Sequence, residues 1–378
     1  MRGILIGLGF VAGLLVAAAG QYLPPGGKAA GGPVPEGLRA RYEGPQSRWP
    51  APRVDGEARL LAALPEPEYP ASNPYSARKE RLGKQLFFDP RLSASGQIAC
   101  ASCHDPELGW ADGRRYSYGH DRQRGEVSAP SILNAGYPER LFWDGRAASL
   151  EEQAVASLTN PVEMAADPDK VVARLSGIEG YRAQFRAVFG SGPIGIGKTA
   201  RAIATFVRSR TMRHTPFDRF MRGDRKALDD RELWGLHLFR TKARCMNCHH
   251  GANLTDGRFH HLGTSFYGVG NYQGRYAVTG RESDYGAFRT APLRGVAHTA
   301  PYMHNGLVPE LRSVLKLYNA GWWQNAPPDQ AGERAPTARL SPRIEPLGLT
   351  GAELDALERF LRALSGGPQR MAPPELPD

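Results

Sequence analysis

The sequence predicts a mainly α-helical chain made of two similar halves. Tyr181, Phe185 and Phe189 recur every four residues, which is the spacing of one helix face. Runs that alternate apolar and polar residues, the pattern of half-buried strands, are few. Two segments share a glycine followed three positions later by an apolar pair, Leu86-Phe87 and then Leu238-Phe239, and each segment leads into a C-x-x-C-H motif. This repeated pattern predicts an internal duplication.

The first 20 residues predict a secretory signal. They contain one early Arg2 and then an unbroken small and apolar run, in which Ala17 and Ala19 offer an A-x-A cleavage site. The run from Ile4 to Gly20 lies at the short edge of the about 17–25 residues that span a bilayer, so a retained N-terminal anchor is the alternative. We expect a periplasmic protein that contacts a membrane only if this segment is retained.

Composition divides the rest of the chain. Residues 21–70 are rich in Pro, Gly, Ala and Arg, which predicts a mobile tether. Residues 71–225 and 226–365 predict two folded domains, one for each half. Residues 366–378, with the sequence GGPQRMAPPELPD, predict a disordered tail.

The second half ends in a helix signal. Thr350 with Glu353 three residues later has the pattern of a capping box, in which each side chain bonds the backbone N–H of the other residue. Leu354, Leu357 and Leu361 then repeat at helical spacing and form one apolar stripe. We expect this helix to pack on the second domain.

All cysteines of the chain lie in the two C-x-x-C-H motifs. The first motif contains Cys100, Cys103 and His104, and the second contains Cys245, Cys248 and His249. This pattern attaches c-type haem, because the two thiols become thioethers to the porphyrin and the histidine takes an axial position on the iron. We therefore expect two covalently attached haem c groups, with no cysteine left for a disulfide.

Two other uses of these cysteines explain the pattern less well. A zinc site built from two C-x-x-C pairs usually keeps them about 15–20 residues apart, and the separation here is far larger. A redox dithiol would need a thioredoxin-like strand and helix around it, which the sequence does not indicate. Both alternatives would also leave the two histidines without a role.

The charge and one Gly-rich motif bear on possible partners. The net charge is +10, but an exported chain without an aromatic-basic motif is not expected to bind nucleic acid. A solvated basic face or an acidic protein partner accounts for this charge.

The segment GPIGIGKT, from Gly192 to Thr199, matches the phosphate-loop pattern, but it follows a helical segment instead of a buried strand. We therefore expect no ATP binding.

Residues 75–365 resemble the bacterial di-haem cytochrome c peroxidase family, including its MauG/MbnH branch. The matching stretches occur in the order of the family and end with the final helix. They are LGKQLFFDPRLSASGQIACASCH, APSILNAGYPERLFWDGRAASLEEQ, NPVEM, PFDRF and RTAPLRGVAHTAPYMHNG. The resemblance implies two cytochrome c-like domains whose haems face a shared interface.

The resemblance also implies a role for three residues near the first haem. Glu163, in NPVEM, holds the acid–base position, which suits the proton transfer that splitting a peroxide O–O bond requires. Gln153 matches a polar residue that positions peroxide or water, and Trp143 matches an indole between the two haems. Hydrogen peroxide is expected to bind at the haem on His104.

The sixth iron ligands determine the subtype. Peroxidases of the family carry Met fourteen residues after the histidine of PY-x-H-x-G, and counting from His304 leads to Tyr318. MauG-like enzymes resemble this chain in carrying Tyr there, and a phenolate favours oxidised iron more than a thioether does. Met303 lies nearby at a position that is not a ligand in the family. His120 matches a distal histidine that closes the first haem in many peroxidases, whereas MauG-like members leave that haem open.

Calcium is also implied by the resemblance. The family holds the ion between its domains with two backbone carbonyls, which match Thr299 and Pro301, and with an Asn side chain. Ser128 stands at the Asn position and is a weaker oxygen ligand. Waters can complete the about 6–8 oxygens that calcium needs, so calcium remains expected.

These expectations combine into a peroxidase that passes oxidising equivalents through Trp143 to the haem on His249 and Tyr318, to oxidise a partner protein. One alternative is a cytochrome c peroxidase that reduces peroxide to water with electrons from a small cytochrome or cupredoxin. The other is a di-haem electron carrier without enzymatic activity. A carrier would not need Glu163, Gln153 or an open iron position, so these residues favour an enzyme.

The two motifs predict two covalent haems for each chain. Mass spectrometry of the denatured mature protein should show two haem additions, because thioether bonds survive unfolding. Replacing Cys245 and Cys248 together by alanine should remove one of the two. One haem or none on the parent protein would contradict the assignment of both motifs.

Overall fold

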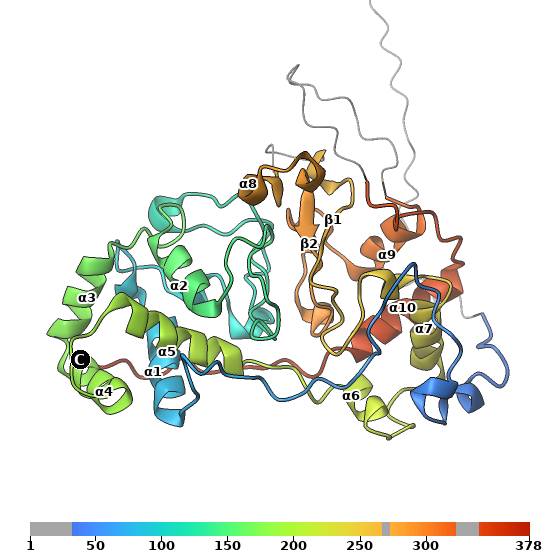
Figure 1. Cartoon of the computed structure of the whole chain (residues 1–378), viewed down its shortest axis with the longest axis horizontal. Helices are drawn as coiled ribbons and strands as arrows, with labels where there is room; N and C mark the ends of the chain where they lie inside the picture. The colour runs from blue at the N-terminus through green and yellow to red at the C-terminus, as the bar shows by residue number, and fades with distance from the viewer. Residues whose placement is uncertain (1–31, 267–272, 323–339) are drawn as a thin grey trace, which may run out of the picture.

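The computed structural model describes residues 32–266, 273–322 and 340–378, and it forms two mainly helical lobes that lie side by side (Figure 1). Each lobe has its own core of buried side chains. Leu82, Leu86 and Phe206 belong to the first core, and Leu236 and Phe360 belong to the second. The expectation of a mainly α fold is confirmed. The predicted signal at residues 1–20 lies outside the described residues.

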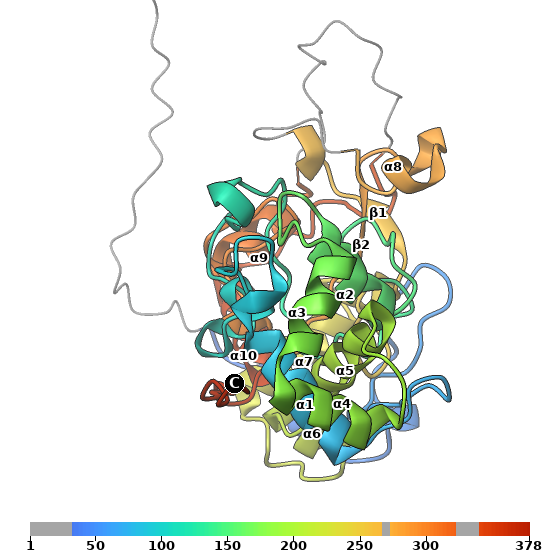
Figure 2. The same ribbon diagram turned by 90° about the vertical axis from the view of Figure 1, so that its left-hand side faces the viewer.

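The first lobe contains five α-helices. This lobe faces the viewer in Figure 2. They are α1 (Ala77–Phe88), α2 (Leu150–Thr159), α3 (Pro168–Gly177), α4 (Glu179–Phe189) and α5 (Ile196–Ser209). The second lobe contains α6 (Pro216–Met221), α7 (Asp230–Arg240), α8 (Tyr276–Thr279), α9 (Leu311–Asn319) and α10 (Gly351–Ala363). Among the described residues, no helix is long and apolar enough to cross a membrane.

The remaining regular elements are short. Strand β1 (Phe259–His261) pairs antiparallel with β2 (Ala287–Arg289), and Phe259 lies opposite Arg289. The described chain also contains short 3₁₀ turns. They are η1 (Arg39–Tyr42), η2 (Gln46–Arg48), η3 (Pro90–Leu92), η4 (Cys100–Ser102), η5 (Pro106–Leu108), η6 (His120–Arg122), η7 (Cys245–Asn247), η8 (Thr264–Phe266), η9 (Glu282–Asp284) and η10 (Val296–His298).

The glycine shared by the two halves has the same structural role in each. A Cβ atom on Gly83 of α1 would lie 1.9 Å from the carbonyl oxygen of Ala202 on α5. A Cβ atom on Gly235 of α7 would lie 2.0 Å from the carbonyl oxygen of Ala356 on α10. Each glycine therefore allows two helix backbones to approach closely, and each lies on the α-helix that precedes a C-x-x-C-H motif. The predicted capping box of α10 also forms, between Thr350 and its N3 residue.

The prediction of a mobile tether is wrong for residues 32–70. Leu38, Tyr42 and Trp49 are buried in the core of the second lobe. The Tyr42 and Trp49 rings lie 5.0 Å apart, and the Arg240 guanidinium lies over both of them. Large apolar residues are sparse in this segment, but each one fills a specific site on the lobe, which composition alone does not reveal.

The prediction of a disordered tail is also wrong. Residues 366–378 leave the second lobe and run beneath the first lobe toward α4 (Figure 1). Met371 packs against the first core, and the carbonyl oxygens of Glu375 and Pro377 accept hydrogen bonds from Gln85 and Arg91. Backbone carbonyls supply most of these contacts, so the proline-rich composition does not prevent them.

A buried ion pair joins three parts of the second lobe. Arg294 Nη1 lies 2.8 Å from Asp218 Oδ1, and both side chains are fully buried. Asp218 also accepts a hydrogen bond from the backbone N–H of Leu64. Arg294 donates to the carbonyl oxygens of Ala62 and Ala252. The pair thus fixes the N-terminal segment and the loop after the second motif to α6.

We expect Asp218→Asn to destabilise the protein by about 3–5 kcal/mol, because it leaves the Arg294 charge buried without its partner. The free energy of unfolding in guanidinium measures this change. Asp230→Asn is a matched control, since Asp230 pairs with Arg39 on the surface and such pairs contribute about 0–1 kcal/mol. Equal losses in the two variants would contradict the central role of the buried pair.

Candidate functional site

A cavity of about 1020 Å³ is lined by residues of both lobes. It brings together the two C-x-x-C-H motifs, although they are far apart in the sequence. The lining residues predicted from the sequence are Cys100, Cys103, His104, Cys245, Cys248, His249, Trp143, Gln153, Glu163, Tyr318, Ser128, Thr299 and Pro301. His120 is not among the lining residues. The structure therefore places nearly the whole predicted site around one cavity.

The two motifs have nearly the same local geometry. In the first, the 3₁₀ turn η4 brings the backbone N–H of His104 to 3.1 Å from the carbonyl oxygen of Cys100. In the second, η7 brings the N–H of His249 to 2.8 Å from the carbonyl oxygen of Cys245. This compact turn places both thiols and the imidazole of each motif on one cavity wall, as covalent attachment and axial ligation of one haem require.

Each motif histidine is held through one ring nitrogen. His104 Nδ1 lies 3.2 Å from the carbonyl oxygen of Trp110, and His249 Nδ1 lies 3.0 Å from that of Leu254. A carbonyl can only accept, so Nδ1 carries the proton and Nε2 is left to bind a metal. Burial lowers the pKa of His104 and lowers the pKa of His249 to about 4, which keeps both imidazoles neutral, the form that ligates iron.

Other features of the cavity also suit haem. Burial raises the pKa of the Cys100 and Cys245 thiols to about 12, and none of the four cysteines forms a disulfide. Arg289 is buried, and burial lowers its pKa to about 10. Its guanidinium donates to the backbone carbonyls of Phe142 and Thr290, and within the described residues it forms no ion pair. A porphyrin propionate is a suitable partner for such a buried cation.

Gln153 and Glu163 stand together on the wall near the first motif. Gln153 lies on α2, and its Nε2 donates to Ser157 Oγ at 3.0 Å. Asn160, which ends α2, donates from Nδ2 to Glu163 Oε1 at 2.8 Å. Burial raises the pKa of Glu163, against the opposing effects of Ser157, Arg146 and Asn160. Sequence reasoning missed Ser157 and Asn160, although their helical spacing from Gln153 was a usable signal.

Trp143 is held by both lobes. Its indole Nε1 donates to the carbonyl oxygen of Ser128 at 2.9 Å, and its own carbonyl accepts from the backbone N–H of Arg289 in β2. Its ring meets that of His304 edge-on at 6.4 Å, and the His304 ring stacks on Phe288 at 3.6 Å. Burial lowers the pKa of His304 to about 3. The indole thus lies in a rigid setting at the contact between the lobes.

Tyr318 lies on α9 and faces the second motif. Burial, with the neighbouring Cys248 and Cys245 thiols, raises its pKa above the ordinary value. Its ring contacts Trp322 edge-on at 5.2 Å. Met303 also lines the cavity. Both candidate ligands are therefore within the site.

His120 does not line the cavity. Its ring Nε2 lies 3.3 Å from Asp121 Oδ2, and its backbone N–H donates to the carbonyl oxygen of Glu163 at 2.8 Å. Its loop therefore rests on the turn that carries Glu163.

The three residues expected to bind calcium, Ser128, Thr299 and Pro301, all line the cavity. The Oγ atom of Ser128 lies 3.5 Å from the carbonyl oxygen of Arg114.

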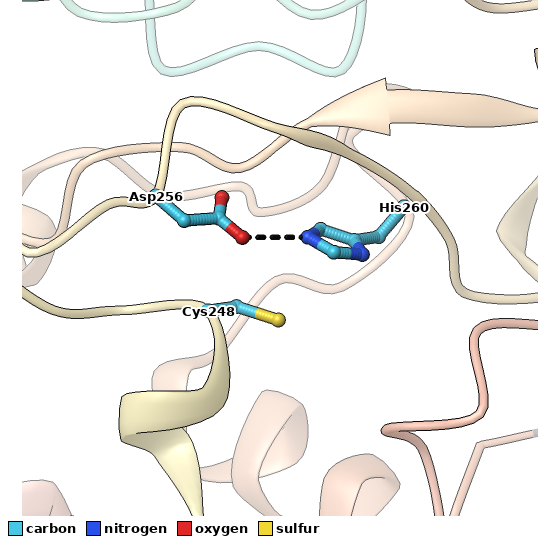
Figure 3. A group of neighbouring side chains, drawn as sticks. All are labelled: Cys248, Asp256 and His260. Carbon is cyan, nitrogen blue, oxygen red and sulfur yellow. Dashed lines mark hydrogen bonds and ion pairs between the residues drawn. The ribbon is translucent and has the colours of Figure 1, made fainter. Parts of the chain in front are cut away.

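Cys248, Asp256 and His260 form a group with metal-ligand character beside the second motif (Figure 3). His260 Nε2 lies 2.8 Å from Asp256 Oδ2. Burial acts to lower the pKa of His260, but the contact with Asp256 raises this pKa to about 9. A thioether at Cys248 would no longer offer a thiolate, so the group belongs to the edge of the haem pocket and is not a separate metal site.

Comparisons with known proteins agree with this geometry. The sequence profile of the family described as di-haem cytochrome c peroxidase matches residues 77–226, and a profile described as RoxA-like, cytochrome c-like matches residues 287–319. The methylamine utilization protein MauG of Methylorubrum extorquens is 38% identical, over 85% of this chain and 88% of that protein. The cytochrome c551 peroxidase of Pseudomonas aeruginosa is 36% identical, over 80% of this chain and 83% of that protein.

A solved structure shows the same architecture. It is described as a MauG-like protein associated with microbial copper homeostasis, and it superposes with a TM-score of 0.73 and 32% identity. The match covers 81% of this chain and 94% of that one. These likenesses extend over most of both chains and include both haem motifs. The chain therefore belongs to the di-haem cytochrome c peroxidase family that includes MauG, and it is a di-haem oxidoreductase that acts on hydrogen peroxide.

Proposed function

We propose that this enzyme takes hydrogen peroxide at the haem on His104 and uses the oxidising equivalents to oxidise a partner protein. The observation that carries this proposal is Tyr318, which is half-buried and lines the cavity beside the second motif, where the peroxidases of the family carry Met. The two haems, when bound, supply the redox chemistry that splits the O–O bond. The protein supplies the proton transfer, the electron path and the tuning of the second iron.

Glu163 and Gln153 supply the proton transfer. As a carboxylate, Glu163 accepts the proton from one peroxide oxygen and returns it to the other oxygen, which leaves as water. Gln153 uses one amide N–H on Ser157 and retains its carbonyl oxygen to orient peroxide or water in the cavity. Burial keeps the pKa of Glu163 above its ordinary value, which suits a group that both accepts and donates a proton.

Trp143 supplies the path between the lobes. An oxidisable indole divides a gap that is too wide for one fast electron transfer into two shorter steps. Its N–H donates to the Ser128 carbonyl, which is not a base. Oxidised Trp143 therefore keeps its proton, and its reduction needs no proton to return.

Tyr318 sets the properties of the second iron. An anionic oxygen stabilises oxidised iron, whereas a soft thioether stabilises reduced iron. Burial disfavours a free phenolate, so a metal is the partner that would make its anionic form favourable. The resulting low potential favours oxidation of a partner over the acceptance of electrons from a mild donor.

The setting of the enzyme follows from its chemistry and charge. We propose that it is exported to the periplasm, as the N-terminal signal and haem c attachment predict. Its net charge of +10 suits an acidic partner protein, since opposite charges speed association.

We also propose that calcium binds near Ser128, Thr299 and Pro301. The bound ion would stiffen the contact between the lobes.

A second candidate is a cytochrome c peroxidase that receives electrons from a small cytochrome or cupredoxin. The likeness to the cytochrome c551 peroxidase favours it, and the two proposals share the steps at Glu163. A non-enzymatic electron carrier accounts less well for a half-buried carboxyl and a glutamine that both line the cavity.

We expect Glu163→Gln to slow peroxide consumption about 10²–10⁴-fold, because the amide cannot transfer the proton. The haem spectra and the binding of peroxide should be retained, since the side chain keeps its shape. Stopped-flow mixing with peroxide measures the rate. Glu126→Gln is the control, because Glu126 also lines the cavity but is exposed. An unchanged rate in Glu163→Gln would rule out its role.

We expect Tyr318→Met to raise the reduction potential of the second haem, by a shift on the order of 0.1 V within the ~0.8 V range that axial ligands span. The first haem should change less. A spectroelectrochemical titration resolves both potentials. Tyr302→Phe is the matched control, since Tyr302 lines the same cavity but donates to the Val296 carbonyl. If neither potential moves in Tyr318→Met, Met303 becomes the ligand to test.

A further inference from the structure

We propose that Tyr75 is a second exit for the oxidising equivalents of peroxide, at which a small phenolic donor is oxidised on the surface of the first lobe. This inference goes beyond the oxidation of a partner protein, and it rests on the proposed use of peroxide at the haem on His104. A line of contacts leads from His104 to Tyr75, and a carboxylate stands where the tyrosine would release its proton.

The line of contacts begins at Trp110, behind the wall of the cavity. Trp110 is fully buried, and its carbonyl oxygen lies 3.2 Å from His104 Nδ1. Its ring lies 6.1 Å from that of Phe87, which lines the cavity. The Arg210 guanidinium, at the end of α5, lies 6.0 Å from the centre of the indole. Trp110 therefore contacts both the first haem pocket and a cation that does not line it.

Glu80 continues the line from this cation to the surface. Arg210 Nη2 donates to Glu80 Oε1 at 2.7 Å, and Ser209 Oγ donates to the same oxygen at 2.8 Å. The other carboxylate oxygen, Oε2, accepts the phenol O–H of Tyr75 at 2.9 Å. Two donors on one oxygen, one of them charged, stabilise the ionised carboxylate and fix its orientation. The contacts are thus continuous from the buried indole to the phenol.

The indole and the phenol differ in how well they would hold an oxidised state. Trp110 faces a guanidinium, and a cation disfavours a positive charge on the indole beside it. Within the described residues its Nε1 also has no hydrogen-bond partner that could take its proton. The phenol of Tyr75 already donates to a carboxylate, so its proton can move to Glu80 as the electron leaves. Oxidation is therefore favoured at Tyr75.

Tyr75 is also accessible to solutes. It is 50% exposed, and its ring lies 5.1 Å from that of Tyr69. The Arg208 guanidinium lies over the Tyr69 ring at 5.7 Å. An aromatic donor can stack on such an exposed pair of rings. A phenol is the matching class of donor, because it gives up the same electron and O–H proton that Tyr75 has lost.

Electrons and protons balance with peroxide as the oxidant. In each step the O–H bond of Tyr75 breaks, its proton goes to Glu80 and its electron goes inward to the first haem pocket. Glu80, whose side chain is partly exposed, releases the proton to solvent. A phenol then returns one electron and one proton to Tyr75 and leaves as a phenoxyl radical. Two such steps supply the two electrons and two protons that convert one peroxide into two waters.

Spin trapping in the holoenzyme tests where the oxidised state rests. The enzyme is treated with peroxide in the presence of 2-methyl-2-nitrosopropane, which bonds to tyrosyl radicals. Tandem mass spectrometry of the tryptic peptide 60–78 distinguishes an adduct on Tyr75 from one on Tyr69. We expect the adduct on Tyr75 and none on Tyr118. Tyr118 is equally exposed on the first lobe, but within the described residues its hydroxyl donates to no carboxylate.

Oxidation of 2-methoxyphenol by peroxide is the second measurement. Tyr75→Phe should lose most of the rate, whereas the matched control Tyr118→Phe should keep the rate of the parent. Glu80→Gln retains Tyr75 but replaces the carboxylate by an amide, which is not a base. It should therefore lose both the adduct on Tyr75 and most of the rate of phenol oxidation.

Each outcome bears on the proposal. An adduct on Tyr75 that depends on Glu80, together with slower phenol oxidation in Tyr75→Phe, supports it. An adduct on Tyr118 instead, or an unchanged phenol rate in Tyr75→Phe, overturns it, because the phenol would then be oxidised elsewhere. If Glu80→Gln does not fold with two haems, the comparison of Tyr75→Phe with Tyr118→Phe decides alone, since each removes one exposed hydroxyl. Failure of the proposed function is distinguishable, because Glu163→Gln would then leave the rate of peroxide consumption unchanged.

Discussion

The contact between the two lobes is the constraint on which the rest of the structure depends. Two redox groups on separate domains exchange electrons only if their separation is short and fixed. Trp143 meets this need because each lobe holds it: its indole donates to Ser128, and its carbonyl accepts from Arg289. Ser128 in turn donates its backbone N–H to the carbonyl of His304. A change in the orientation of the lobes would break these bonds together.

The two ends of the chain reinforce this contact. The N-terminal segment packs on the second lobe before the chain enters α1 of the first lobe. The C-terminal segment leaves α10 of the second lobe and binds Gln85 and Arg91 of the first. The lobes are thus joined by crossing segments as well as by the connection between α5 and α6. Residues 32–70 and 366–378, which composition assigns to a tether and a tail, are instead packed against the lobes.

The residues proposed for proton transfer and those proposed for electron transfer lie in separate parts of the cavity. The polar group of Gln153, Ser157, Glu163 and Asn160 lies on α2 and the turn that follows it, next to the first motif. Beside the second motif the nearby carboxyl is that of Asp256, which pairs with His260 and is separate from this polar group. The family resemblance concerns the whole cavity, whereas the proposed subtype depends on the ligand at Tyr318.

The sequence by itself determined the haem attachment motifs, the family and the candidate residues that the structure brings to one cavity, because each depends on short motifs whose spacing is covalently set. Cys100 through His104 can bind one haem whatever surrounds them. Only the tertiary structure revealed that residues 32–70 and 366–378 are packed, because a few apolar side chains and backbone carbonyls find their sites only on a folded surface. It also placed the His120 ring outside the cavity and set the Trp143 indole on the carbonyl oxygen of Ser128. Those positions depend on where a loop rests and on how the two lobes meet, and no spacing along the chain encodes either one.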